Sequence, residues 1–194
     1  IAGLIGLIYS IIRVKDLTLE NHRRREAERN VEWIATHDAL TELPNRRMLD
    51  REISAAAAEG RRTERTVFSV DLDGFKRVND LFGHAVGNEV LKTVAERLKS
   101  SFPDDCVYRI GGDEFIVITC GADTETATAS AQRIVQQLTA PIDADVMTVD
   151  VGASVGYAFS PGGADALNTA ILQSDYAMYA AKASGRNRAM AFEP

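Results

Sequence analysis

Two apolar, β-branched segments on either side of consecutive glycines constrain the fold of this chain more than any other feature. Residues 107–110 and 114–119 read as strands, and the Gly111-Gly112-Asp113 sequence between them is typical of a β-hairpin turn. A hairpin joins antiparallel neighbours, which excludes a purely parallel sheet. Because helical periodicity alternates with further strands, we expect an α+β domain whose antiparallel or mixed sheet is covered by helices.

Hydrophobic periodicity places the remaining elements of this domain. Apolar residues at helical spacing predict helices, and continuous or alternating apolar runs predict strands. Gly60 and Gly185 follow two of the helical patterns and are expected to end them. The predicted helices cover residues 46–59, 74–81, 87–98, 123–138 and 165–184, and the further strands cover residues 66–72, 146–151, 154–159 and 189–192.

Composition excludes several classes of protein. Two cysteines among 194 residues are too few for a disulfide scaffold, and the three histidines are not spaced with cysteines as in a structural zinc site. The net charge of −6 argues against non-specific binding to DNA or RNA, although local geometry can still bind a small anion. Cys106 and Cys120 flank the hairpin out of register, so we expect buried free thiols.

The first 35 residues predict helices that precede the domain. Residues 1–12 are apolar, but as a helix they rise only about 18 Å, less than the bilayer core of about 30 Å. Arg13 and Lys15 follow directly, as at the cytoplasmic end of a membrane helix. We therefore expect residues 1–12 to be the tail of a truncated transmembrane helix, with a buried or partner-packed amphipathic helix as the alternative. Residues 13–35 predict a helical connector, either self-pairing or a solvated linker.

Acidic residues gather where two predicted strands end. Asp71 and Asp73 lie where the apolar strand predicted over residues 66–72 ends, and Asp113 and Glu114 lie at the tip of the hairpin. Carboxylates brought together there could share Mg²⁺, while the helix beginning at Gly74 offers its N-terminal N–H groups to an anion. Each of these features alone is weak evidence for a metal or phosphate site. Acidic pairs are most often turn residues, and a Gly-Gly turn most often indicates only a hairpin.

The whole segment Arg109-Ile-Gly-Gly-Asp-Glu-Phe115 is a more specific indication of function. It resembles the signature of the GGDEF family, the bacterial diguanylate cyclases. Further motifs of the family follow in the expected order. The resemblance covers residues 36–194, which we expect to form the GGDEF domain. The other matching segments are residues 38–47, 71–79, 82–84, 87–88, 154–157, 175–182 and 185–187.

The resemblance implies both a fold and an activity. The fold is a five-stranded, mainly antiparallel sheet surrounded by helices, related to the palm of nucleotide cyclases and polymerases. The activity is condensation of two GTP into cyclic di-GMP with release of two pyrophosphates, supported by Mg²⁺ or Mn²⁺. Because one chain binds one GTP, the resemblance implies a two-fold homodimer. With the apolar start of the chain, it places the protein at the cytoplasmic face of the bacterial inner membrane.

Residue roles are carried over by position. Asp71, the Leu72 carbonyl, Asp113 and Glu114 correspond to the metal ligands, and Asp113 and Glu114 are the catalytic pair, with Asp113 as general base. A metal-bound carboxylate is a poor base, so metal activation of the hydroxyl could carry most of the effect. The implied substrate-binding residues are Gly74, Phe75, Lys76, Asn79, His84, Asn88, Lys182 and Arg186. The spacing of Lys182 and Arg186 predicts that both lie near one helix face.

Two positions depart from the family pattern. Residue 88 is Asn where the family often has Asp, so only one acceptor oxygen faces guanine and weaker binding is expected. The product-inhibition site pairs an Arg with an Asp; here Asp105 is present, but Phe102 stands at the Arg position. Without a guanidinium there is no bidentate clamp, and we expect no high-affinity product binding there.

Two other functions remain open from the sequence. One is a GTP-binding regulatory module of low turnover that controls an adjacent phosphodiesterase domain of the EAL family. The other is a membrane-tethered structural scaffold, which would have no use for the metal and phosphate residues. The intact Gly-Gly-Asp-Glu-Phe sequence favours an active cyclase.

Overall fold

The computed structural model divides the chain into two units, residues 1–36 and residues 37–194. It describes residues 2–59, 63–102, 107–121, 123–144, 147–162 and 165–193, without the side chains of residues 2–12, 14, 16 and 59. Asp105 and Cys106 lie outside these ranges, so the expectations for them stay untested. Within the ranges, Cys120 is exposed because it ends its strand, which contradicts the expected burial.

The first unit is one helix, α1 (Ala2–Thr36). It joins the two segments predicted over residues 1–12 and 13–35 into a continuous backbone. Exposed apolar side chains include Leu17, Val31 and Ile34, and Arg24 donates to Glu28 at 2.9 Å along the helix surface. Among the described residues, no helix combines the length and apolarity needed to cross a bilayer.

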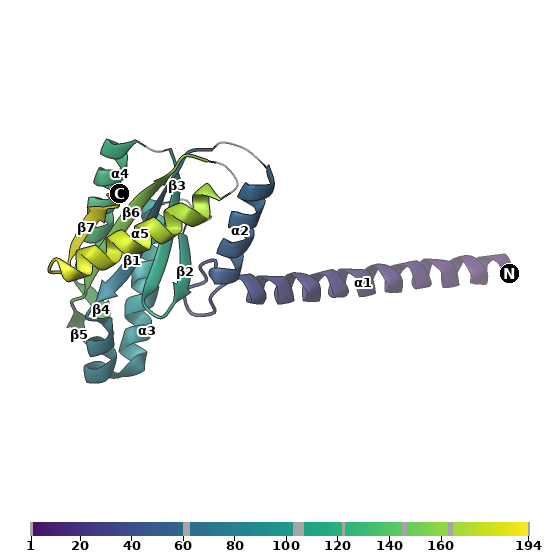
Figure 1. Ribbon diagram of the computed structural model, residues 1–194. Coiled ribbons are helices and arrows are strands. Elements are labelled where there is room, and N and C mark those ends of the chain that lie inside the picture. The colour runs from purple at the N-terminus through teal and green to yellow at the C-terminus, as the bar shows by residue number, and fades with distance from the viewer. Residues whose placement is uncertain are drawn as a thin grey trace. The chain divides into compact units, whose positions relative to one another are not determined.

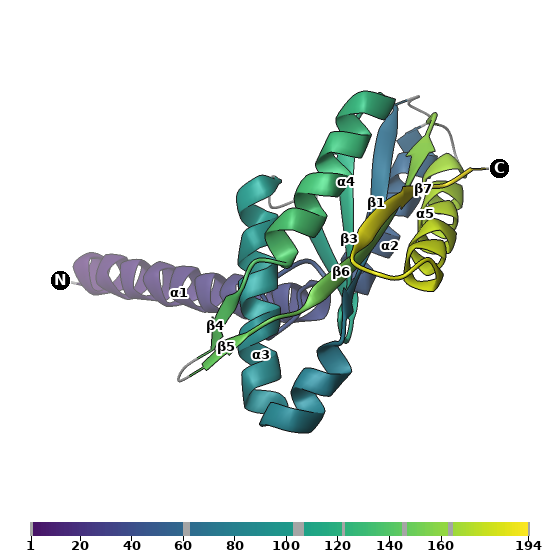
Figure 2. The same cartoon turned by 90° about the vertical axis from the view of Figure 1, so that its left-hand side faces the viewer.

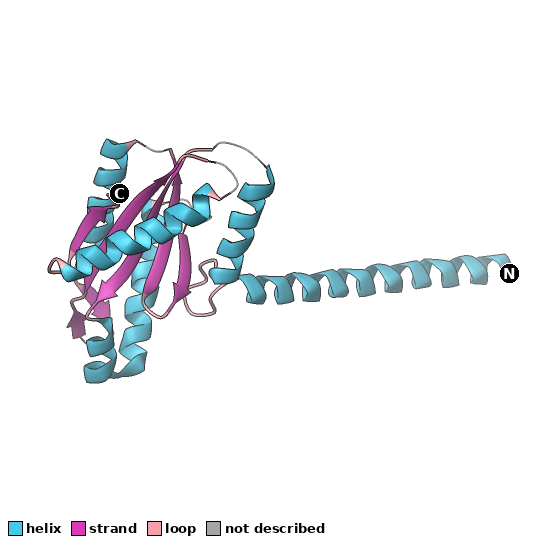
Figure 3. Cartoon of the chain, viewed as in Figure 1, coloured by secondary structure: helices cyan, strands magenta, loops and turns pink. Residues whose placement is uncertain are grey.

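The second unit is built on a five-stranded sheet in the order β2-β3-β1-β6-β7 (Figures 1 and 3). The first three pairings in that order are antiparallel, and β6 pairs with β7 in parallel. This confirms the predicted α+β class and the mainly antiparallel sheet. The strands are β1 (Arg65–Asp73), β2 (Val107–Gly111), β3 (Glu114–Cys120), β6 (Gly152–Ser160) and β7 (Arg188–Ala191).

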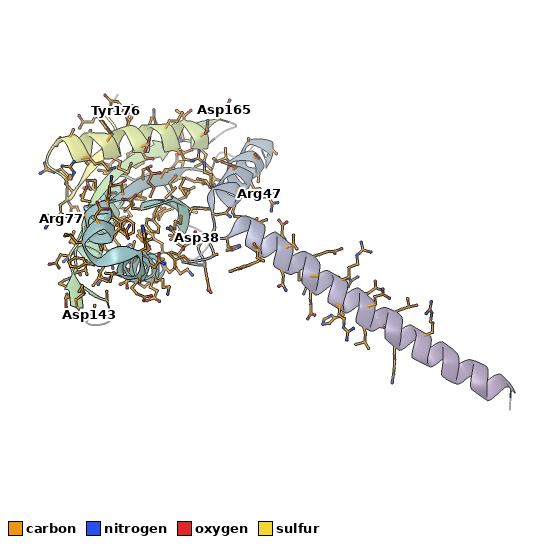
Figure 4. The ribbon with its side chains drawn as sticks, turned by 90° about the horizontal axis from the view of Figure 1, so that it is seen from below. Asp38, Arg47, Arg77, Asp143, Asp165 and Tyr176 are labelled. Atoms are coloured by element: carbon orange, nitrogen blue, oxygen red, sulfur yellow. The ribbon has the colours of Figure 1, made fainter. Side chains whose placement is uncertain are left out.

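Helices cover both faces of the sheet, α2 and α5 on one side and α3 and α4 on the other (Figure 2). The view from below shows the same layers, with Tyr176 on the outer side of α5 and Arg77 on α3 across the sheet (Figure 4). The helices are α2 (Arg46–Glu59), α3 (Phe75–Ser101), α4 (Thr124–Leu138) and α5 (Ala166–Ala183).

Two details differ from the sequence prediction. The helices expected at 74–81 and 87–98 form one run, α3, with a non-helical break at Gly83. The strand expected at 146–151 is shorter and lies outside the main sheet: β5 (Met147–Val149) pairs only with β4 (Ile142–Ala144), and residue 146 is not described. Three-residue strands carry too little alternation to be recognised from sequence.

The central strand β1 contributes side chains to the core on both faces of the sheet, because successive side chains alternate between faces. Phe68 and Val70 pack with α3 and α4, whereas Val67 packs with residues of α2 and α5. All three are completely buried, and burying each contributes about 1.5–3 kcal/mol relative to exposure. On the face toward α5, the Ser69 hydroxyl bonds that of Ser174 at 2.8 Å, which satisfies both groups in a buried position.

The close approach of α5 to the sheet depends on Gly156 in β6. A Cβ at Gly156 would overlap Met178 N and Ser174 O of the α5 backbone and lie 2.7 Å from Ala177 C. Backbone atoms cannot rotate away as a side-chain end can. The absent side chain therefore fixes the distance between α5 and the sheet.

We predict that Gly156→Ala destabilises the domain by roughly 1–3 kcal/mol, because α5 must move outward to admit the methyl group. Chemical denaturation measures the change. Gly152→Ala is the matched control on the same strand, where the nearest atom to the new Cβ is a side-chain atom 3.0 Å away, and it should cost less. Equal stability of Gly156→Ala and the wild type would contradict this reading of the packing.

Candidate functional site

Three carboxylates meet at the end of β1 that faces the hairpin turn. Asp71 and Glu114 are direct cross-strand partners, and the Leu72 N–H donates to the Asp113 carbonyl at 3.3 Å. Asp71 is only 7% exposed, Asp113 is half-buried and Glu114 is exposed. The sequence motif and the sheet register thus bring together residues that lie about forty positions apart in the chain.

Burial and mutual repulsion disfavour the ionised forms of two carboxylates in this cluster. Burial and then the charge of Asp71 raise the pKa of Asp113 above its ordinary value. Partial burial, and then the charges of Asp71, Asp175 and Asp113, raise the pKa of Glu114. Asp175 on α5 begins the matching segment 175–182 but was not among the predicted site residues, because its proximity to Glu114 arises from the packing of α5.

Lys182 supplies the nearest positive charge. Its Nζ lies 2.7 Å from Asp71 Oδ2, and it sits in the last turn of α5. The ammonium lowers the pKa of both Asp113 and Glu114, but less than burial and the neighbouring carboxylates raise them. The predicted substrate-binding lysine is therefore at the site, where it offsets part of the acidic charge.

Arg186 reaches the same end of the sheet by a different route from the one predicted. The α5 helix ends at Ala183, so Lys182 and Arg186 do not share a helix face, and that expectation is wrong. Gly185, Arg186 and Asn187 all have positive φ, which turns the chain back toward β1. The Arg186 guanidinium then lies 3.8 Å from Asp73.

Asp73 organises this returning segment, a role that the sequence did not reveal. Its two carboxylate oxygens each accept from the Ser154 hydroxyl at 2.9 Å, and Oδ2 also accepts from the Asn187 N–H at 2.9 Å. These partners come from β6 and from beyond α5. Asp73 therefore anchors the segment with Arg186, whereas Asp71 remains paired with Lys182 alone among the contacts described.

The hairpin turn is held from outside by Arg109. Its Nε and Nη2 donate to the Gly112 carbonyl at 3.1 and 2.8 Å, and its Nη1 donates to Asp38 Oδ1 at 2.6 Å. Asp38 also accepts from the backbone N–H and the hydroxyl of Thr41, and these bonds stabilise the turn that follows Asp38. Burial raises the pKa of Asp38, but the bonds from Thr41 and Arg109 together bring it below the ordinary value.

The other predicted substrate-binding residues lie on or beside α3. Gly74 is the N-cap in a left-handed conformation (φ 83°), so the first free N–H groups of α3 follow directly after β1. Lys76, His84 and Asn88 have exposed side chains and Asn79 is half-buried. The Phe75 side chain is buried in the core, which leaves only its backbone to face a ligand.

Phe102 occupies core space instead of a surface site. Its side chain is 5% exposed, packs near the Phe68 ring at a centroid distance of 6.4 Å, and lies 5.3 Å below the Arg133 guanidinium. The position is thus filled by a packed aromatic ring. Asp105, its predicted partner, lies outside the described residues.

The donor set of the cluster suits a hard divalent cation. Asp71, Asp113 and Glu114 offer carboxylate oxygens, and Mg²⁺ in proteins is commonly held by one or two carboxylates together with substrate phosphates. The raised pKa values of Asp113 and Glu114 show acidic charge that the chain itself leaves only partly balanced. Within the described ranges, no three His, Cys, Asp or Glu side chains lie close enough together to hold a metal ion by themselves.

Comparison with known proteins is consistent with this geometry. Residues 35–188 match the family model described as diguanylate cyclase, GGDEF domain. The bifunctional diguanylate cyclase/cyclic di-GMP phosphodiesterase MucR of Pseudomonas aeruginosa is 35% identical over 196 residues, 100% of this chain and 28% of MucR. The probable diguanylate cyclase DgcT of Escherichia coli is 38% identical over 159 residues, 80% of this chain and 35% of DgcT.

Solved structures give the same result. The coiled coil and GGDEF domain of DgcB from Caulobacter crescentus, in complex with c-di-GMP, has a TM-score of 0.82 at 30% identity and covers 92% of this chain and 97% of that chain. The GGDEF domain of TpbB (YfiN) from Pseudomonas aeruginosa has a TM-score of 0.72 at 34% identity, over 81% and 94%. The chain spans about a third or less of the length of the two curated relatives, MucR and DgcT.

We predict that Asp113→Asn raises the Tm of the protein at pH 7 when divalent cations are absent. The folded-state pKa of Asp113 is raised, so its ionised form destabilises the fold, and the penalty disappears as the pH falls and the carboxylate is protonated. The gain in Tm should therefore shrink between pH 7 and pH 4. Added Mg²⁺ should stabilise the wild type more than the variant.

Thermal unfolding over this pH range tests the prediction. The control is Glu96→Gln, which changes an exposed carboxylate in the C-terminal part of α3. The control should show neither the gain at pH 7 nor the altered response to Mg²⁺. A lower Tm for Asp113→Asn at pH 7 would contradict the proposed balance of charge.

Proposed function

The chain belongs to the GGDEF family of diguanylate cyclase domains, and on that premise we propose that it condenses two GTP molecules into cyclic di-GMP. The observation that carries the proposal is the cluster of Asp71, Asp113 and Glu114 beside Lys182, at the end of β1 where α3 begins. Carboxylates for a cation, an ammonium and a helix N-terminus for phosphates are the groups that nucleotidyl transfer uses.

We assign the cation site to the carboxylates of Asp71, Asp113 and Glu114 with the Leu72 carbonyl. Mg²⁺ or Mn²⁺ bound there would supply charge neutralisation for phosphate groups and acidify a bound hydroxyl. Lys182 would exchange its contact with Asp71 for a phosphate contact, since the cation takes over the neutralisation of Asp71. Arg186, placed by Asp73, would contact the phosphates from the other side.

We assign recognition of the base to α3, with Asn79 and Asn88 contacting the guanine edge and His84 near the nucleotide. The N–H groups that follow Gly74, with Lys76 beside them, would face the phosphates. Asn88 offers one acceptor oxygen where a carboxylate would offer two, so binding of guanine is expected to be weaker than with Asp at that position. With Phe102 packed in the core, we expect no tight product binding beside it.

The product contains two nucleotides, so we propose that two copies of the chain meet with their nucleotide sites facing each other. The exposed apolar residues of α1, among them Val31 and Ile34, would set the spacing of the two copies by pairing. A position at the cytoplasmic face of the inner membrane also remains our proposal. The low-turnover regulatory function is not favoured, because relatives such as DgcT are named as diguanylate cyclases.

The test is to incubate the chain with GTP and Mg²⁺ and to separate the nucleotides by chromatography. We expect cyclic di-GMP from the wild type and from the Glu96→Gln control, and a loss of at least about hundredfold in Asp113→Ala and Glu114→Ala. The rate per chain should rise with protein concentration, because the dimer forms by mass action.

GTP binding without product, at protein concentrations where the chain is dimeric, would contradict the proposed activity. A rate per chain that is independent of concentration, while the chain is monomeric, would contradict the proposed role of the second copy.

A further inference from the structure

The bend in α3 brings two of its residues into contact across the break. Gly83 has φ 84° and ψ 165°, which ends one helical segment and starts the next. Asn79 lies on the first segment and Gly87 on the second, and Gly87 is buried. A Cβ built at Gly87 would overlap Asn79 Oδ1 and would lie 3.0 Å from Asn79 Cγ and 3.4 Å from Phe75 Cζ.

The Asn79 amide thus rests on the bare backbone of Gly87. Within the part of the chain that the structure describes, the amide has no hydrogen-bond partner, and the residue is half-buried. An amide offers one acceptor oxygen and two N–H donors. Because these groups are unused, the amide is suited to hydrogen bonding with a flat, polar ligand edge.

Glycine at position 87 lowers the stability of the helix. Except for proline, it is the least favourable residue in a helix interior, and an alanine would favour the second segment of α3. The backbone of Gly87 has no positive φ that would require glycine. The space occupied by Asn79 Oδ1 is therefore the constraint that the structure places on this residue.

We propose that Gly87 is a positioning residue for base recognition: its missing side chain leaves the space in which the Asn79 amide is held toward the nucleotide. The proposal rests on the proposed function, in which Asn79 contacts guanine. A methyl group at position 87 rotates the Asn79 side chain out of place without removing any group that touches the nucleotide. Gly87 then determines the selectivity for guanine through Asn79.

The experiment compares Gly87→Ala, Asn79→Ala and the double variant, with Glu96→Ala as control for a substitution on the same helical segment. Calorimetry measures the affinity for GTP and for ATP, and NMR follows the side-chain amide resonances of Asn79 in the nucleotide-free protein. Thermal unfolding reports on the fold.

We expect Gly87→Ala to bind GTP about tenfold more weakly, as for one lost hydrogen bond, and to discriminate less between GTP and ATP. The Asn79 amide resonances should shift, and Tm should not fall. In the double variant the new methyl group has space, so its GTP affinity should equal that of Asn79→Ala. The Glu96→Ala control should bind as the wild type does.

Unchanged GTP affinity in Gly87→Ala, or a further loss when it is added to Asn79→Ala, would overturn the inference. If Gly87→Ala does not fold but the double variant does, the clash with Asn79 is supported. If neither variant folds, the inference is overturned. If Asn79→Ala binds GTP like the wild type, the guanine contact of the proposed function is wrong, and the shift or constancy of the Asn79 resonances then decides the positioning claim.

Discussion

The site depends on one guanidinium group. Arg109 donates twice to the Gly112 carbonyl and once to Asp38, and its side chain is only 10% exposed. The turn residue Gly112 has φ 53°, a conformation that a residue with a Cβ adopts at a cost. Because Asp113 and Glu114 follow directly, the three hydrogen bonds from Arg109 set where both carboxylates lie. A planar fork with donors in several directions is what makes this possible.

The fold concentrates negative charge there and only partly offsets it. Because side chains alternate along β1, Ser69, Asp71 and Asp73 point toward α5. The apolar residues between them point into the core on the other face of the sheet, with α3 and α4. Asp73 is satisfied by Ser154 and the segment after α5, while Asp71 meets Lys182 and raises the pKa of its carboxylate neighbours. On the proposed function, the remaining acidic charge would weaken the fold without cations and would favour binding of a cation together with phosphates. An acidic chain can in this way bind a polyanionic substrate.

Local patterns in the sequence were enough to predict the main elements and the carboxylate cluster. The hairpin, β1 and α2 carry strong periodicity and clear turn residues, and the resemblance to the family supplied the sheet and the site. Contacts set by tertiary packing were not predictable: Asp175 near Glu114, Asp73 with Asn187, and Asn79 against Gly87 each join residues whose spacing carries no periodic signal. The helical reading of Arg186 was wrong because Gly185 and the left-handed residues after it reverse the chain.

The most direct test of the central claim is to measure cyclic di-GMP formation and GTP affinity together in Arg109→Lys. Lysine keeps the positive charge, but its single ammonium cannot reproduce the two hydrogen bonds to the Gly112 carbonyl together with the one to Asp38. We expect the affinity for GTP to change little, because the proposed base contacts lie on α3. Turnover should fall by about hundredfold, because the proposed catalytic carboxylates would be displaced. Wild-type turnover in a folded Arg109→Lys protein would contradict the claim that this guanidinium positions Asp113 and Glu114 for the proposed reaction.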